Sequence, residues 1–123
     1  MDFVFMCDRK VLAKPERVGE ETIYKLTGEV SDDHIPPGLF RNGITETSQK
    51  VTEWFCTRVF PENRVGSEQL LDELELDKYD PWYIVKKTNG CLMEDPWWLK
   101  IRDTDSYETS TVRGAAEAKG YKL

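Results

Sequence analysis

The sequence predicts a small α+β domain, in which an antiparallel sheet packs against about three helices. Short apolar or alternating segments separated by tight turns fill residues 3–26 and predict strands. Three later segments, within residues 45–88, carry the apolar spacing or the end signals of helices. A last apolar segment, residues 97–101, predicts one more strand. At 123 residues the chain has room for one core, which we place in residues 1–102.

The N-terminal third predicts a three-stranded antiparallel meander. Its strands are residues 3–7, 10–13 and 22–26. The polar pair Asp8-Arg9 supplies the first turn, and residues 16–21, around Gly19, supply the second. Regular structure then ends at Pro36-Pro37-Gly38, because proline lacks a backbone donor and glycine permits a turn.

The first predicted helix runs from about Thr45 to Phe60. Its apolar residues fall at helical spacing and share one buried face: Val51, Trp54, Phe55 and Val59. Thr45 and Thr47 are both possible N-caps, and Pro61 is expected to end the helix. We also expect Arg58 and Arg64 to be structural residues, since the charge of Arg58 is favourable near a helix C-terminus.

Two further helices are predicted from their end signals. Ser67 is expected to cap a helix over residues 68–76, with Leu70, Leu71 and Leu74 facing inward. The third helix opens at Asp80-Pro81, where aspartate accepts from free amides and proline suits the first helical position. Lys86 and Lys87 lie in its last turn, and Asn89-Gly90 supplies a left-handed stop.

The C-terminal part is expected to form a strand and a tail. Trp97 and Trp98 are adjacent in the last predicted strand, so their side chains point to opposite faces, one buried and one partly exposed. From residue 103 the composition shifts to small and polar residues. Residues 103–123 are therefore predicted to be either a loosely ordered tail or a tail with a short helix near residues 112–119.

Charge and composition limit the possible partners. The net charge of −6 disfavours direct binding to nucleic acid or to an anionic membrane, and it favours a basic protein partner. No apolar run approaches the length of a membrane span, and no signal peptide is recognised, so we expect a cytoplasmic protein. Cys7, Cys56 and Cys91 have no paired spacing, which predicts reduced thiols, no metal site and no cofactor.

Two sets of residues are candidates for catalytic chemistry. His34, the only histidine, follows two aspartates and is a possible general base, but its place before two prolines favours a role in turn structure. The neighbouring carboxylates Glu94 and Asp95 are interpreted as solvated surface, since paired catalytic carboxylates must converge across a cleft. We therefore predict that the protein is not an enzyme.

Acidic residues are concentrated between residues 62 and 80, where only Arg64 and Lys78 oppose them. This strip is either a solvated face or a docking site for a basic partner. Exposed tryptophan is a frequent anchor in interfaces, so the tryptophan pair is also a candidate. The candidate partner-binding residues are Glu68, Asp72, Glu73, Glu75, Asp77, Trp97 and Trp98.

Scattered positions in order along residues 3–101 resemble the N-terminal region of HipA-like proteins of clostridial bacteria. The matching positions are His34, Pro36 and Gly38; Trp54, Arg58, Pro61 and Arg64; Leu70, Leu71 and Leu74; and Gly90, Asp95, Trp97, Trp98 and Leu99. In that family the segment precedes a kinase-like body, whose catalytic motifs this sequence lacks. The resemblance implies a small recognition or regulatory module of the kind that mobile elements encode.

The leading hypothesis is a non-enzymatic inhibitor or regulator that binds a basic, nucleic-acid-binding bacterial protein. Antitoxin-like regulators and anti-CRISPR proteins of phages or plasmids are instances of this class. A structural or assembly subunit of a mobile element, with the tail as an arm, is the alternative. An enzyme centred on His34 ranks third. The oligomeric state is left open.

Overall fold

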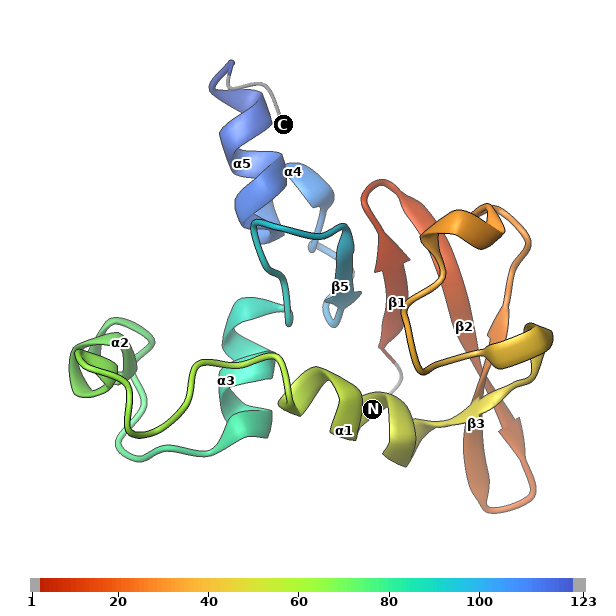
Figure 1. Ribbon diagram of the computed structural model, residues 1–123, viewed down its shortest axis with the longest axis horizontal. Helices are drawn as coiled ribbons and strands as arrows, with labels where there is room; N and C mark the ends of the chain where they lie inside the picture. The colour runs from red at the N-terminus through yellow and green to blue at the C-terminus, as the bar shows by residue number, and fades with distance from the viewer. Residues whose placement is uncertain (1–2, 121–123) are drawn as a thin grey trace.

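A five-stranded antiparallel sheet forms the centre of the computed structural model, which describes residues 3–120 (Figure 1). The strand order is β4-β3-β2-β1-β5. The strands are β1 (Val4–Cys7), β2 (Lys10–Val18), β3 (Glu21–Leu26), β4 (Glu46–Thr47) and β5 (Trp97–Lys100). Five α-helices accompany the sheet: α1 (Ser48–Cys56), α2 (Ser67–Glu73), α3 (Pro81–Thr88), α4 (Tyr107–Ser110) and α5 (Val112–Ala118). The predicted α+β class is confirmed.

The N-terminal meander is present as predicted, with one difference in its second turn. β2 continues to Val18, so the predicted turn over residues 16–21 shortens to two residues, Gly19 and Glu20. Pairing in this part of the hairpin is made by the backbone, and its side chains are largely exposed, so polar residues are tolerated there. The polar residues Glu16 and Arg17 therefore concealed the end of this strand.

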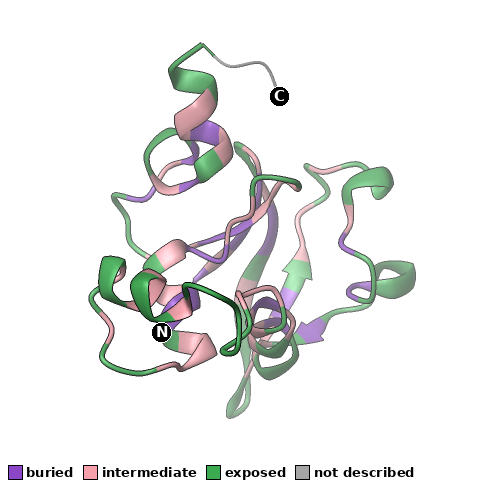
Figure 2. Cartoon of the chain, turned by 60° about the vertical axis from the view of Figure 1, so that its left-hand side comes forward, coloured by how far each residue is buried: buried purple, intermediate pink, exposed green. Residues whose placement is uncertain are grey.

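Two clusters of buried side chains lie on the two faces of the sheet, because neighbouring strand residues point in opposite directions. Phe5 and Leu99 belong to the larger cluster, which α1 and α3 cover with Phe55 and Val85. The smaller cluster contains Met6, Trp98 and Tyr107. Figure 2 shows the buried residues gathering along the central strands and the elements packed against them.

The helix α1 is shorter than predicted. Thr47 is its N-cap and accepts a hydrogen bond from the amide of Lys50 at 3.1 Å, which decides between the two predicted caps. The helix ends at Cys56 rather than at Phe60. The amides of Thr57 and Arg58 still donate to carbonyl oxygens of the last helical turn, and the chain that follows is not helical. Pro61 therefore does not end α1.

Trp54 is half-buried on α1, whereas its helical spacing predicts a buried side chain. Its ring packs edge-on against Phe55 and Trp97, with centroid distances of 5.1 and 5.9 Å. The end signals of α3 are confirmed: the Asp80 side chain accepts from the amide of Trp82 at 3.0 Å, and Asn89 has a left-handed φ of 58°.

The C-terminal residues are folded against the sheet rather than loosely ordered. Of the two alternatives for this segment the short helix is found, as α5, and α4 precedes it. Ser106 and Thr111 cap the two helices with their side chains. Tyr107 of α4 is buried in the smaller cluster, so this segment, which we call the C-terminal unit (residues 105–119), completes a core. Residues 121–123 of the predicted tail lie outside the described residues.

None of the helices in residues 3–120 has the length and apolar character that crossing a membrane requires.

Gly114 provides a test of how the C-terminal unit is held together. A Cβ atom at this position would collide with the backbone carbonyl of Tyr107, so α4 and α5 can approach only over a glycine. We expect Gly114→Ala to lower the free energy of unfolding by about 1–3 kcal/mol, because overpacking forces backbone shifts. Urea denaturation measures the change. The control is Ala118→Gly at an exposed position of α5, which should lower the free energy of unfolding by about 1 kcal/mol or less. Equal losses of stability in the two variants would contradict the close approach of α4 and α5 at Gly114.

Candidate functional site

The predicted acidic strip lies on a loop that is closed at its base. The hydroxyl of Tyr79 donates to the carbonyl oxygen of Phe60 at 2.7 Å, and the two rings pack edge-on at 5.9 Å. Residues 61–78 therefore leave and rejoin the body at one point, and we call them the acidic excursion. Its helix, α2, lies at the edge of the molecule opposite the sheet (Figure 1).

Helix α2 differs from its prediction at both ends. Gly66, in a left-handed conformation with φ 85°, occupies the N-cap, and Ser67 instead donates its hydroxyl to the carbonyl oxygen of Glu62 at 2.7 Å. The helix ends at Glu73 rather than at residue 76, and Glu75 has a positive φ of 61°. The three leucines expected to face inward are only half-buried, and α2 contributes no buried residue. The excursion therefore lies on the surface rather than in the core.

All five acidic candidates are exposed on this excursion. These residues are Glu68, Asp72, Glu73, Glu75 and Asp77. Within residues 3–120 none of them forms an ion pair, and the nearby cations Arg64 and Lys78 form none either. The excursion holds six carboxylates and two cations, so it carries −4 of the net charge of −6. The predicted strip is thus an exposed, uncompensated acidic surface.

The tryptophan pair does not extend that surface. Trp98 is only 1% exposed and its indole donates to the carbonyl oxygen of Asp8 at 2.9 Å, so Trp98 is a core residue and is removed from the partner-binding set. Trp97 lies on the other face of β5, half-buried, and its indole donates to the carbonyl oxygen of His34 at 2.8 Å. The expected split of one buried and one partly exposed tryptophan is correct.

His34 has contacts that match a role in turn structure. Besides accepting from Trp97 through its carbonyl oxygen, it places its ring Nδ1 3.0 Å from the hydroxyl of Ser31. Both residues are exposed, on the loop between β3 and β4. The hydrogen bond from Trp97 connects the loop to the start of β5, and the one between Ser31 and His34 lies within the loop.

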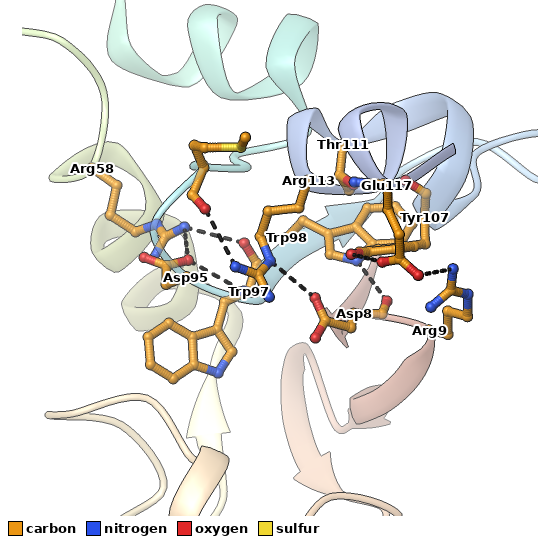
Figure 3. Close-up of polar contacts among 12 residues, drawn as sticks. Asp8, Arg9, Arg58, Asp95, Trp97, Trp98, Tyr107, Thr111, Arg113 and Glu117 are labelled. Atoms are coloured by element: carbon orange, nitrogen blue, oxygen red, sulfur yellow. Dashed lines mark hydrogen bonds and ion pairs between the residues drawn. The ribbon is translucent and has the colours of Figure 1, made fainter. Parts of the chain in front are cut away.

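Arg58 makes the most extensive set of polar contacts of any side chain in residues 3–120 except Asp105, and the sequence predicted only part of it. Both of its terminal nitrogens donate to the carboxylate of Asp95 at 2.9 Å, and one also donates to the carbonyl oxygens of Gly90 and Trp97 at 3.1 Å (Figure 3). The guanidinium carbon lies 4.6 Å from the ring centre of Trp54. The interpretation of Asp95 as solvated surface is wrong, because this carboxylate is the ion-pair partner of a side chain that is 10% exposed.

The C-terminal unit is fastened to the turn between β1 and β2 by a second group of charges. Arg9 donates to Glu108 at 2.8 Å and to Glu117 at 3.0 Å, and its guanidinium lies over the ring of Tyr107 at 4.4 Å. Arg113 donates to the carboxylate of Asp8 at 3.3 Å. Figure 3 shows Arg9 meeting Glu117, and Arg113 meeting Asp8, between the turn and α5. No local pattern in the sequence predicts these contacts, because the partners are about a hundred residues apart.

Asp105 is the buried acceptor at the start of the C-terminal unit. Burial alone would raise the pKa of Asp105. Hydrogen bonds from the amides of Arg102 and Ile101 and from the side chains of Asn89 and Ser110 stabilise the carboxylate and outweigh burial, so the pKa of Asp105 is lowered.

The cysteine thiols do not have the features of reactive nucleophiles. Burial raises the pKa of all three thiols, that of Cys7 to about 11, so they are protonated near neutral pH. No cluster of three metal-ligating side chains occurs within residues 3–120.

Comparisons with known proteins found no matching protein family, no matching curated protein and no matching solved structure. The resemblance to the N-terminal region of HipA-like proteins therefore stays a prediction.

The lowered pKa of Asp105 predicts that acid releases the C-terminal unit. In the unfolded chain the carboxyl group of Asp105 has the ordinary pKa of an aspartate, about 3.9. It therefore stabilises the native state above that pH, and this contribution is lost as pH falls through the lower native pKa. We expect the protection factors of α5 amides, which compare the exchange rate with that of an unfolded chain at the same pH, to fall more than those of α1 amides between about pH 5 and pH 2.

Two variants at neighbouring positions separate Asp105 from general acid effects. Asp105→Asn should loosen α5 already at neutral pH, while Asp103→Asn, at an exposed position, should keep the wild-type pH response. An identical pH response in all three proteins would contradict the role of Asp105.

Proposed function

We propose that the protein is a non-enzymatic regulator or inhibitor that binds a basic protein partner through the acidic excursion. The observation that carries this proposal is a contrast between two groups of carboxylates. Those of Glu46, Asp95 and Asp105 are mostly buried and paired with cations, whereas those of the excursion are exposed and have no cationic partner within residues 3–120.

The excursion carries a charge arrangement that costs the free protein some stability. Glu68 and Asp72 lie four residues apart in α2, and like charges at this spacing are destabilising by about 0.2–0.5 kcal/mol. Lysine or arginine side chains of a partner would relieve this repulsion. The surrounding field would also accelerate association with a positively charged surface.

Apolar surface accompanies the charge. Val65, at the start of the excursion, is 97% exposed, and no residue of α2 is buried. An interface usually combines an apolar centre with a polar rim, and Val65 next to α2 offers such a combination. A partner can therefore contact the apolar and acidic side chains of the excursion without any rearrangement of the sheet or its core.

A basic, nucleic-acid-binding bacterial protein fits this surface best. An acidic surface that occupies the basic region of such a protein competes with its nucleic acid, which would make the protein an inhibitor. Antitoxin-like and anti-CRISPR proteins encoded by mobile elements act in this general manner and are the proposed class. The assembly-subunit alternative relied on a free C-terminal arm, and residues 105–119 are instead packed against the body. An enzyme centred on His34 stays the third hypothesis.

Charge reversal on the excursion tests the proposal. The variant Asp72→Lys/Glu73→Lys/Glu75→Lys should slow association with the basic protein captured from a bacterial lysate at least about tenfold at low salt, because steering depends on opposite charge. Raising the salt concentration should reduce the difference in association rate between the wild type and this variant, since charges more than about 8 Å apart are largely screened at 0.15 M ionic strength. Stopped-flow or surface-based kinetics at two salt concentrations measure both effects.

A matched control is available on the other side of the molecule. Glu16→Lys/Glu20→Lys/Glu21→Lys makes the same change in net charge at exposed positions of the β2–β3 hairpin. This control should keep most of the wild-type association rate. Equal association rates for both triple variants would show that the excursion is ordinary solvated surface.

A further inference from the structure

The three asparagines of the chain differ in two features that decide whether an asparagine can lose its side-chain amide. Asparagine is one of the chemically labile residues of proteins. Asn42 and Asn89 are each followed by glycine, whereas Asn63 is followed by Arg64. Glycine leaves its backbone nitrogen open to reaction, because it has no Cβ and adopts many conformations. The second feature is whether the asparagine side chain is held in place, and here the structure separates Asn42 from Asn89.

Asn42 lies in an exposed turn of the loop between β3 and β4. The turn is a single 3₁₀ turn, Arg41–Gly43, and all of its residues are exposed. The Asn42 side chain makes no hydrogen bond to the part of the chain that the structure describes, residues 3–120, so its amide is free to rotate. Figure 1 shows this loop beyond β3, at the opposite end of the molecule from α2.

Asn89, in contrast, is held by the fold. It is 4% exposed, and its Nδ2 donates to the carbonyl oxygen of Leu99 at 2.9 Å and to the carboxylate of Asp105 at 2.7 Å. Both hydrogen bonds must break before the side chain can turn toward the backbone nitrogen of Gly90. Asn89 is therefore an anchored copy of the same Asn-Gly pair.

The backbones of the two Asn-Gly pairs are closely matched. Asn42 has φ 55° and ψ 27°, and Asn89 has φ 58° and ψ 19°. Each following glycine donates its backbone N–H in a hydrogen bond, of 3.0 Å after Asn42 and 3.2 Å after Asn89. Opening of the exposed turn frees the nitrogen of Gly43, and exposed turns open at little cost in free energy. At Asn89 the two side-chain hydrogen bonds have to break as well.

We propose that Asn42 is a site of spontaneous deamidation and that the fold protects Asn89 from the same reaction. Hydroxide removes the proton of the Gly43 N–H, and the nitrogen bonds to the side-chain carbonyl carbon of Asn42. The amide group takes a proton from water and leaves as ammonia. Water then opens the cyclic succinimide at either carbonyl, which gives aspartate or isoaspartate and adds one negative charge to the net charge of −6. The site lies apart from the acidic excursion, so either proposal can fail without the other.

Peptide mapping of the full-length protein tests the proposal. After incubation at mildly alkaline pH, peptides prepared at acidic pH are analysed by mass spectrometry with fragmentation that distinguishes isoaspartate from aspartate. Asn89 should deamidate at least about tenfold more slowly than Asn42, because two hydrogen bonds hold its side chain. The exposed Asn63, which no glycine follows, should also deamidate more slowly than Asn42. In urea that unfolds the protein, the rate at Asn89 should approach the rate at Asn42.

Two variants complete the test by anion-exchange chromatography. The incubated wild type should yield a more acidic species. Asn42→Gln should yield little of it, because the longer side chain closes the ring far more slowly, while Asn63→Gln should yield it at the wild-type rate. Three outcomes would overturn the proposal: equal rates at Asn42 and either other asparagine in the native protein, an undiminished difference between Asn42 and Asn89 in urea, or equal yields of the acidic species from the two variants.

Discussion

The ion pair between Arg58 and Asp95 is the interaction on which the arrangement of helices and sheet depends. Arg58 follows the end of α1, and through one side chain it reaches the turn after α3 and the start of β5. Its guanidinium also covers the ring of Trp54, which packs against the larger cluster of buried side chains. A charge that is nine-tenths buried requires this many partners, because an unpaired buried charge is strongly destabilising. Three segments that are distant in sequence therefore meet at one residue.

The rest of the charged residues divide into those that hold the fold and those that do not. Arg9 and Arg113 fasten the C-terminal unit to the turn between β1 and β2, and Asp105 fixes its first residues. The acidic excursion takes no part in this network within residues 3–120, and its closure rests on Phe60 and Tyr79. Because the carboxylates of the excursion form no ion pairs within residues 3–120, they remain available to bind a partner. The proposed function rests on this availability.

Local signals in the sequence were sufficient for much of the fold. The cap at Asp80 and the left-handed stop at Asn89 act through the nearest backbone groups, so the sequence alone predicts them. Alternation likewise predicts β3 and the opposite directions of Trp97 and Trp98. By contrast, Asp95 was interpreted as solvated because its partner is 37 residues away, and no spacing rule relates the two. The acidic excursion was found from composition, whereas the contacts of Arg58 with Gly90, Trp97 and Trp54 became visible only in three dimensions.

A double-mutant cycle measures the central interaction most directly. The free energies of unfolding of wild type, Arg58→Met, Asp95→Asn and the double variant are obtained from urea denaturation at neutral pH. If the pair joins the helices to β5, each single substitution costs about 3 kcal/mol or more, because it leaves a partly buried charge without its partner. The double variant should then be more stable than the sum of the single effects predicts, by about 2–3 kcal/mol. Costs that add within about 0.5 kcal/mol would contradict this account.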